Sequence, residues 1–208
     1  MSFSSFFSNQ ARKPSGLFGR LVMSIIFDFG NSLLNRFVNE LLSPQNGEFI
    51  LDIGCGTGKL IYTMASQIGD GKFEGIDFSE TMVSMAQKRN KENIHNGQVK
   101  ILKGNFDELP LQNDHYDKVC SINTIYFWPK PEYTAQKIAA ITKPGGFFIA
   151  GFEDKEQLEQ RNLDADVFKI YSTEEVKNLF VGAGFSSGVT IESRTKGKLI
   201  FHCVVARK

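Results

Sequence analysis

The segment Phe49-Ile50-Leu51-Asp52-Ile53-Gly54-Cys55-Gly56-Thr57-Gly58 combines a short apolar run with three alternating glycines. The apolar run predicts a buried strand, and residues 59–68, which follow the last glycine, have the pattern of a helix. Glycine permits tight turns and a close approach of the backbone to a ligand, and the first turn of a helix has unpaired N–H groups. A strand, a glycine loop and a helix in this order therefore predict a ligand-binding turn.

Strand-like and helix-like patterns alternate along the rest of the chain. Further strands are predicted at 73–76, 99–102, 116–122, 147–150, 189–192 and 199–205. Further helices are predicted within 17–42 and at 79–90, 131–141, 153–161 and 172–183, the last opened by a capping box. This alternation predicts an α/β domain with a mostly parallel sheet, and Gly197 between the last two strands predicts a terminal hairpin.

The composition is that of a folded domain without a bulk charge. Lys and Arg number 24 and Asp and Glu number 23 in 208 residues, which gives a formal net charge of +1. This balance argues against a nucleic-acid partner that is bound through bulk charge. The chain is long enough to bury its own core, and it carries no signal for an oligomeric state.

The cysteines and the N-terminus predict a protein of a reducing compartment. Cys55, Cys120 and Cys203 are odd in number and far apart in sequence, which fits neither a disulfide framework nor a metal site. The first residues lack the basic region of a secretory signal. The apolar stretch 21–27 is far shorter than the ~20 residues of a membrane helix. We therefore expect a cytoplasmic protein that is not stably inserted in a membrane and that binds no metal.

Asp77 is the second sign of a ligand, because it ends the next strand 19 residues after Gly58. An acid at this place suits the two hydroxyls of a ribose, so the pattern predicts a cofactor that contains a nucleoside. The NAD fingerprint requires Gly or Ala where this chain has Lys59, and Asp52 would repel a pyrophosphate. Asp52 would instead favour a positively charged amine. The loop thus favours S-adenosylmethionine over NAD. The remaining alternative is a structural turn that binds no ligand.

These motifs resemble those of the class I S-adenosylmethionine-dependent methyltransferases, in particular the small-molecule branch around ubiquinone and menaquinone biosynthesis. The matching segments are 52–58, 75–79, 104–110, 141–146, 171–175 and 183–185. The resemblance covers about residues 44–208. It implies a Rossmann-like, doubly wound sheet of seven strands in the order 3-2-1-4-5-7-6, with strand 7 antiparallel. Residues 1–43 would form an N-terminal arm and a helical lid, and residues 44–208 the methyltransferase domain. The apolar residues of the N-terminal region, such as Phe18 and Phe27, could equally well pack only in the core.

The resemblance implies that the glycine loop holds the methionine part of S-adenosylmethionine. Gly54, Gly56 and Gly58 would pass under this part of the cofactor, with Cys55 between the first two. The backbone carbonyl groups of the loop would bind the amine of the cofactor. Asp52 would support that amine.

The same resemblance assigns the adenosine part and the methyl group to later residues. Asp77 would bind the ribose hydroxyls, and Phe78 would pack on the adenine. Asn105, where the family often has Asp, and the backbone of Phe106 would contact the edge of the adenine. Asn123, after the fourth strand, would face the sulfonium.

The methyl acceptor is expected beside segment 121–129, which leaves the fourth strand at its C-terminal end. Tyr126, Phe127 and Trp128 in this segment suit a small apolar or aromatic acceptor, although they would also suit packing against the N-terminal helix. Residues 152–171 would form a second wall. The catalytic candidates are Asn123 and Tyr126, where Tyr126 is the only candidate base of the segment.

Three functions are compatible with these patterns. The favoured one is methyl transfer from S-adenosylmethionine to a small acceptor. The alternative is a non-catalytic, S-adenosylmethionine-binding partner subunit or sensor, since binding motifs alone do not prove turnover. An NAD-linked oxidoreductase is disfavoured by Lys59 and Asp52. We interpret His95, His115 and His202 as structural or solvated residues.

Overall fold

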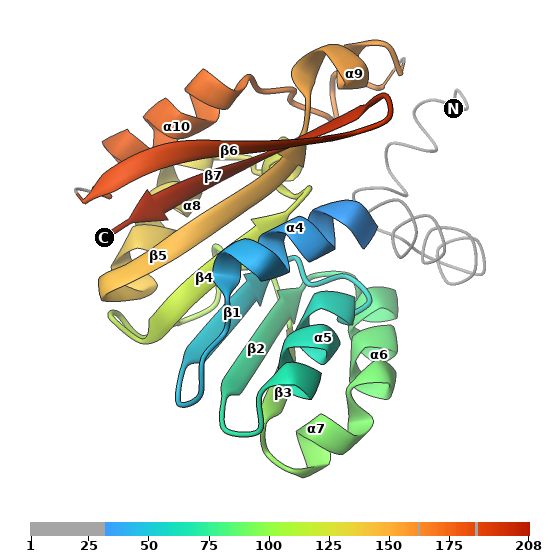
Figure 1. Ribbon diagram of the computed structural model, residues 1–208, viewed down its shortest axis with the longest axis vertical. Helices are drawn as coiled ribbons and strands as arrows, with labels where there is room; N and C mark the ends of the chain where they lie inside the picture. Colours follow the sequence, from blue (N-terminus) through green and yellow to red (C-terminus); the bar gives the residue numbers. More distant parts are fainter. Residues whose placement is uncertain (1–31, 162, 186) are drawn as a thin grey trace.

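The computed structural model describes residues 32–161, 163–185 and 187–208 (Figure 1). Its strands are β1 (Phe49–Ile53), β2 (Lys72–Asp77), β3 (Val99–Lys103), β4 (Tyr116–Ile122), β5 (Thr142–Glu153), β6 (Gly188–Lys196) and β7 (Leu199–Arg207). Its helices are α4 (Ser32–Leu42), α5 (Lys59–Gln67), α6 (Glu80–Arg89), α7 (Lys91–His95), the 3-10 turn η2 (Ile125–Phe127), α8 (Pro131–Ile141), α9 (Lys155–Glu159) and α10 (Thr173–Gly182). The helix and lid expected before residue 32 lie outside the described residues.

The strands form one seven-stranded sheet in the order β3-β2-β1-β4-β5-β7-β6. The first five strands of the chain pair in parallel, and β7 pairs antiparallel with both β5 and β6. The expected strand order and the terminal hairpin are therefore confirmed. Asp52 on β1 is in register with Gly75 on β2 and Cys120 on β4, so these strands end at the same edge of the sheet.

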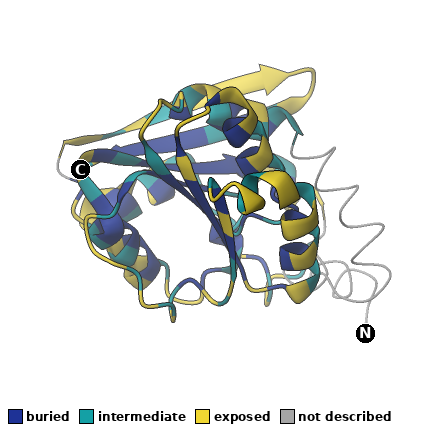
Figure 2. Cartoon of the chain, turned by 90° about the horizontal axis from the view of Figure 1, so that it is seen from below, coloured by how far each residue is buried: buried dark blue, intermediate teal, exposed yellow. Residues whose placement is uncertain are grey.

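Helices pack on both faces of the sheet, and most residues of its central strands are buried (Figure 2). On one face, α4, α5 and α6 pack on alternate strand residues such as Ile50 and Ile149. On the other face, α8 and α10 pack on the intervening residues, such as Leu51 and Phe148. Alternate residues of a strand point to opposite faces, so most residues of the central strands β1 and β4 are buried.

Helix α4 is the described part of the region that was expected to form an arm and lid. Its buried side chains are Leu34, Phe37, Val38 and Leu42. In Figure 1 it lies across one face of the sheet, and its buried residues belong to the same core cluster as β1, β4 and β5. This helix therefore contributes to the core, and the division of the chain at residue 43 stays a prediction.

Several element boundaries differ from expectation, and local contacts account for three of these differences. His95 was expected in a loop, but it is the last residue of the short helix α7. This helix follows α6 directly, since Asn90 is both the C-cap of α6 and the N-cap of α7. The fifth strand begins at Thr142 rather than residue 147, since Thr142 already pairs with Tyr116 across an irregularity in the ladder. Helix α9 is limited to Lys155–Glu159, where the Asp154 side chain caps its N-terminus.

Candidate functional site

The three glycines of the loop have left-handed backbone angles, with φ of 73° at Gly54, 52° at Gly56 and 69° at Gly58. A side chain on Gly54 would collide with Thr124, and one on Gly58 would lie 2.8 Å from the Cβ of Ala86. A Cβ on Gly56 would meet no described atom within 4 Å. The loop is thus enclosed by protein at both ends and open in its middle, a shape that lets a ligand approach the backbone closely.

The end of β2 holds the first half of this loop. The N–H groups of Gly54 and Cys55 donate to the carbonyl oxygen of Ile76, at 2.8 and 3.0 Å. The N–H of Gly56 donates to Asp77 Oδ2 at 2.9 Å, and that of Ser79 donates to Asp77 Oδ1 at 2.8 Å. Burial raises the pKa of Asp77, and these two hydrogen bonds oppose the rise. Each carboxylate oxygen has two lone pairs, so Asp77 can accept further hydrogen bonds from a ribose.

Asp52 is a buried acid on β1, beside the loop. The Cys120 thiol donates to its Oδ1 at 3.7 Å. Burial raises the pKa of Asp52 to about 7, the thiol lowers it, and the charge of Asp77 raises it. A buried carboxyl group in this state is stabilised as the carboxylate by a cationic partner, such as the ammonium group of an amino acid.

The residues expected to hold the adenine follow β2 and β3. Phe78 is 38% exposed, as a surface for stacking requires. Asn105 donates through Nδ2 to Glu108 Oε1 at 2.9 Å and accepts from the N–H of Asp107 at 3.2 Å. Phe106 is buried. These residues lie at the same edge of the sheet as the glycine loop, because β2 and β3 run parallel to β1.

The segment after β4 places Asn123 and Tyr126 together. Asn123 has a left-handed φ of 55°, and its N–H donates to the carbonyl of Gly151 at 2.8 Å. The Tyr126 hydroxyl donates to Asn123 Oδ1 at 3.3 Å and accepts from the N–H of Glu153 at 2.8 Å. Burial raises the pKa of Tyr126, so its phenol stays protonated at neutral pH. This argues against Tyr126 as a general base and in favour of a role as hydrogen-bond donor to Asn123.

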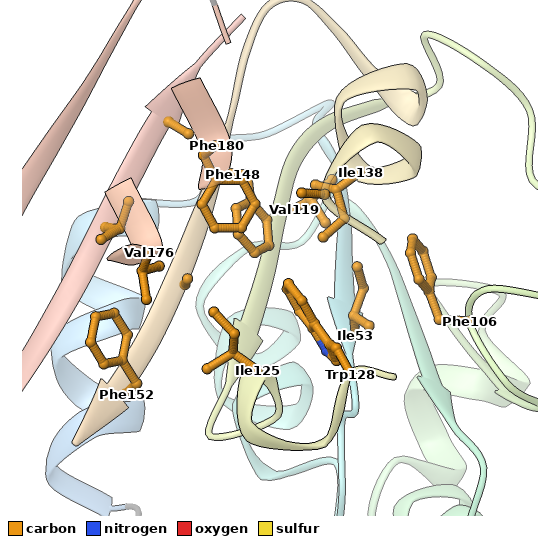
Figure 3. Close-up of a cluster of buried hydrophobic side chains, with 14 of the residues drawn as sticks. Ile53, Phe106, Val119, Ile125, Trp128, Ile138, Phe148, Phe152, Val176 and Phe180 are labelled. Atoms are coloured by element: carbon orange, nitrogen blue, oxygen red, sulfur yellow. The ribbon is translucent and has the colours of Figure 1, made fainter. Parts of the chain in front are cut away.

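The aromatic residues of this segment differ in how far they are buried. Trp128 is buried and packs on Phe180 of α10, with ring centroids 6.4 Å apart. Figure 3 shows its indole inside the core cluster, with Ile53 and Ile125 nearby. Phe127 is only half-buried, and its ring lies 4.7 Å from that of Phe168.

Phe168 is a neighbour of Phe127 that the sequence analysis did not name. It lies in the segment between α9 and α10, which was expected only in general terms to form a second wall. The next residue, Lys169, donates its N–H to the carbonyl of Tyr126 at 3.0 Å. No local pattern could reveal this contact, since the two residues are 43 positions apart in the chain.

His115 lies at the edge of the sheet opposite the glycine loop, whereas His202 lies near the end of β5, at the same edge as Glu153. His115 packs against Phe49 and Tyr116, where β1 and β4 begin. His202 bonds to Ser193 and Asp154 beside the terminal hairpin. Within the described ranges, no group of three potential metal ligands comes together.

Comparison with known proteins identifies the family of this fold. Residues 50–146 match the family model described as "Methyltransferase domain". The uncharacterized methyltransferase YdaC of Bacillus subtilis is 30% identical over 126 residues, which cover 61% of this chain and 67% of that protein. The demethylmenaquinone methyltransferase of Bacillus pumilus is 33% identical over 115 residues, which cover 53% of this chain but only 47% of that protein.

The fold also matches solved structures. The methyltransferase in a Haloferax volcanii complex with the Trm112 methyltransferase activator superposes with a TM-score of 0.77 at 19% identity, over 97% of this chain and 98% of that chain. Among the described residues, no helix is long and apolar enough to cross a membrane. The chemistry of these residues is compatible with S-adenosylmethionine. The glycine loop is open at Gly56, the buried Asp52 suits an amine, and the hydrogen-bonded Asp77 suits a ribose. The chain therefore belongs to the class I methyltransferases that use S-adenosylmethionine as their cofactor.

Proposed function

We propose that this enzyme methylates a small aromatic or apolar acceptor, which reaches the cofactor beside the segment that follows β4. The observation that carries this proposal is the half-buried Phe127, packed against Phe168, in the same short segment as Asn123. An apolar surface with one oriented polar group is typical of sites for small apolar ligands. The name of the Bacillus pumilus relative, demethylmenaquinone methyltransferase, agrees with an acceptor of the quinone type.

The glycine loop is proposed to hold the methionine part of the cofactor. Gly54, Cys55, Gly56 and Gly58 offer backbone groups, and the open side of Gly56 gives the ligand access. Asp52 would attract the ammonium group, because a cation beside a buried carboxyl group favours its ionised form.

The adenosine part is proposed to lie over the ends of β2 and β3. Asp77 would accept hydrogen bonds from the two ribose hydroxyls, since its buried oxygens already face the loop through the N–H of Gly56. Phe78 would stack on one face of the adenine. Asn105 and the backbone of Phe106 would contact the edge of the ring.

Bound S-adenosylmethionine supplies an electrophilic methyl group on a positively charged sulfur. The protein then has to orient the acceptor and exclude water, and such positioning provides a large part of the barrier reduction in transfer reactions. Tyr126 fixes Asn123 through the hydrogen bond to Oδ1, while Glu153 holds the Tyr126 hydroxyl in place. Asn123 is therefore proposed to contact the sulfonium or the acceptor, and Tyr126 to position Asn123.

The test is a transfer assay with S-adenosylmethionine and two acceptors, a short-chain demethylmenaquinone analogue and a simple phenol. We expect release of S-adenosylhomocysteine together with a methylated product detected by mass spectrometry. Asn123→Ala and Phe168→Ala should lower turnover, while Asn113→Ala, which changes an exposed loop residue, should not.

Cofactor binding without methylation of either acceptor would contradict this proposal. That result would favour the alternative, a domain that binds S-adenosylmethionine as a partner subunit or sensor. Equal turnover by wild type and Phe168→Ala would show that the pair of Phe127 and Phe168 does not contact the acceptor.

A further inference from the structure

The C-terminal end of α6 contacts the second half of the glycine loop. Asn90 donates through Nδ2 to the carbonyl of Gly58 at 3.1 Å. Arg89 donates through Nη1 to the carbonyl of Thr57 at 3.0 Å and also contacts the Thr57 hydroxyl. Two consecutive side chains thus bind two consecutive loop residues, 32 positions earlier in the chain.

This contact is tight as well as polar. Gly58 caps the N-terminus of α5 with a left-handed φ of 69° and no side-chain cap. A Cβ at Gly58 would lie 2.8 Å from the Ala86 Cβ and 2.8 Å from Asn90 Nδ2. The backbone of the loop therefore rests directly on α6, and any shift of this end of the helix would be transmitted to Gly58.

The two halves of the loop are consequently fixed by different elements. The first half bonds to Ile76 and Asp77 at the end of β2. The second half, Thr57 and Gly58, bonds to α6. Gly56 lies between them, at the open point where a ligand can reach the backbone.

We propose that Arg89 and Asn90 are positioning residues for cofactor binding, which hold the second half of the glycine loop in the shape that receives the methionine part. They act through Thr57 and Gly58 and do not contact the cofactor. The inference rests on the proposed role of this loop. It predicts that the two side chains contribute to cofactor affinity in addition to any contribution to the stability of the fold.

Asn90 permits these two contributions to be separated. Its side chain is fully buried, and Nδ2 also donates to the carbonyl of Ala86 at 3.0 Å. Its Oδ1 has no hydrogen-bond partner among the described residues. Leucine has nearly the same shape, so Asn90→Leu removes both donated bonds but also removes a buried acceptor that lacks a partner. The loss of folding stability is then partly offset, while the contact with the loop is lost.

The experiment measures the dissociation constant of S-adenosylhomocysteine by calorimetry, and thermal unfolding without ligand, for wild type, Arg89→Met and Asn90→Leu. We expect each variant to bind about tenfold more weakly, a loss of about 1.4 kcal/mol. The control is Lys88→Met, which removes the same charge from an exposed neighbour and should change the constant by less than about twofold.

Wild-type affinity in folded Arg89→Met and Asn90→Leu would overturn the inference, even if both variants unfold at lower temperature. If Asn90→Leu fails to fold, Arg89→Met decides alone, because Arg89 is only partly buried. Equal weakening by Lys88→Met would also overturn it, since the effect would then come from net charge. Absence of binding to the wild type would instead contradict the proposed role of the loop.

Discussion

Asp52 is the residue whose electrostatics differ most from those of an exposed acid. Its pKa is raised by burial from 3.8 to about 7. Well below pH 4 the carboxyl group is protonated in both the folded and the unfolded chain. As the pH rises towards 7, the unfolded chain loses this proton more readily than the folded one, so the folded state loses stability. An ionised Asp52 therefore destabilises the cofactor-free protein.

Asp52→Asn should for this reason stabilise the cofactor-free protein at pH 8. We expect a gain of about 1–3 kcal/mol at pH 8 and a much smaller difference near pH 4, because asparagine has no proton to lose. Urea unfolding of wild type and variant at both pH values measures this gain. Stability curves that run parallel between pH 4 and pH 8 would show that Asp52 is not the group responsible.

Cofactor affinity should rise with pH, whereas the stability of the cofactor-free protein should fall. The ammonium group of S-adenosylhomocysteine is attracted by the carboxylate form of Asp52, and this form becomes populated as the pH passes about 7. The dissociation constant of the wild type should fall between pH 6 and pH 8, as measured by calorimetry. In Asp52→Asn the dissociation constant should be larger, which means weaker binding, and it should be nearly independent of pH. An equal pH dependence in both proteins would assign it to another group.

The site residues that sequence predicted and those that it missed differ in the range of their contacts. Asp52 and Asp77 lie at the ends of the adjacent strands β1 and β2, and the glycines follow β1, so a local pattern of strand and turn was enough to place them at one edge of the sheet. Arg89 reaches the loop across 32 positions. Phe168 meets Phe127 only after the segment beyond β5 folds back. These contacts depend on tertiary packing and leave no periodicity in the sequence.

At the scale of single elements, the capping box of α10 was predicted from sequence and is confirmed. The Ser172 side chain accepts from the N–H of Glu175 at 3.3 Å, and Glu175 Oε2 accepts from the N–H of Ser172 at 2.7 Å. Val176 and Phe180 of this helix are fully buried, so the cap begins a helix that the core needs. The sequence analysis did not predict helix α7, because this helix has no buried residue and its sequence therefore shows no periodic spacing of apolar residues.

Ser172→Ala should destabilise the protein by about 1 kcal/mol, because the first turn of α10 loses the partner of its N–H group. For a chain of this size we expect a melting temperature lower by roughly 2–4 °C. Ser172→Asp keeps a side-chain acceptor at the N-cap and should restore most of the loss. An equal decrease in both variants would mean that the cap is not the source of the stability.

At the scale of the whole molecule, α4 connects the central sheet to the terminal hairpin. Its buried face packs on the sheet, and its Glu40 bonds to Arg194 of β6 at 2.6 Å. The Arg194 guanidinium also lies 4.2 Å from the centre of the Phe37 ring. Composition and periodicity predicted a helix in this region, but they left open whether it covers the cofactor site or the core. The buried residues of α4 resolve this for residues 32–42 in favour of the core.

At Gly151 the backbone of β5 lies close to α4. A Cβ on Gly151 would lie 2.8 Å from Val38 Cγ2 and 3.3 Å from Leu34 Cδ1. Gly151→Ala should therefore push the helix away from the sheet and destabilise the protein by about 1–3 kcal/mol, the usual cost of overpacking a core. Urea unfolding measures this loss.

The double variant identifies the cause of that loss. Val38→Ala alone should be destabilising because it leaves a cavity, but it also creates the space that the new methyl group of Gly151→Ala needs. We therefore expect the two changes together to cost less than the sum of the single changes, by about 0.5 kcal/mol or more. The matched control is Gly182→Ala in α10, where a Cβ would meet no described atom within 4 Å and alanine favours the helix. Strict additivity of Gly151→Ala and Val38→Ala would mean that the methyl group does not act on α4, so the loss would have to come from β5 itself.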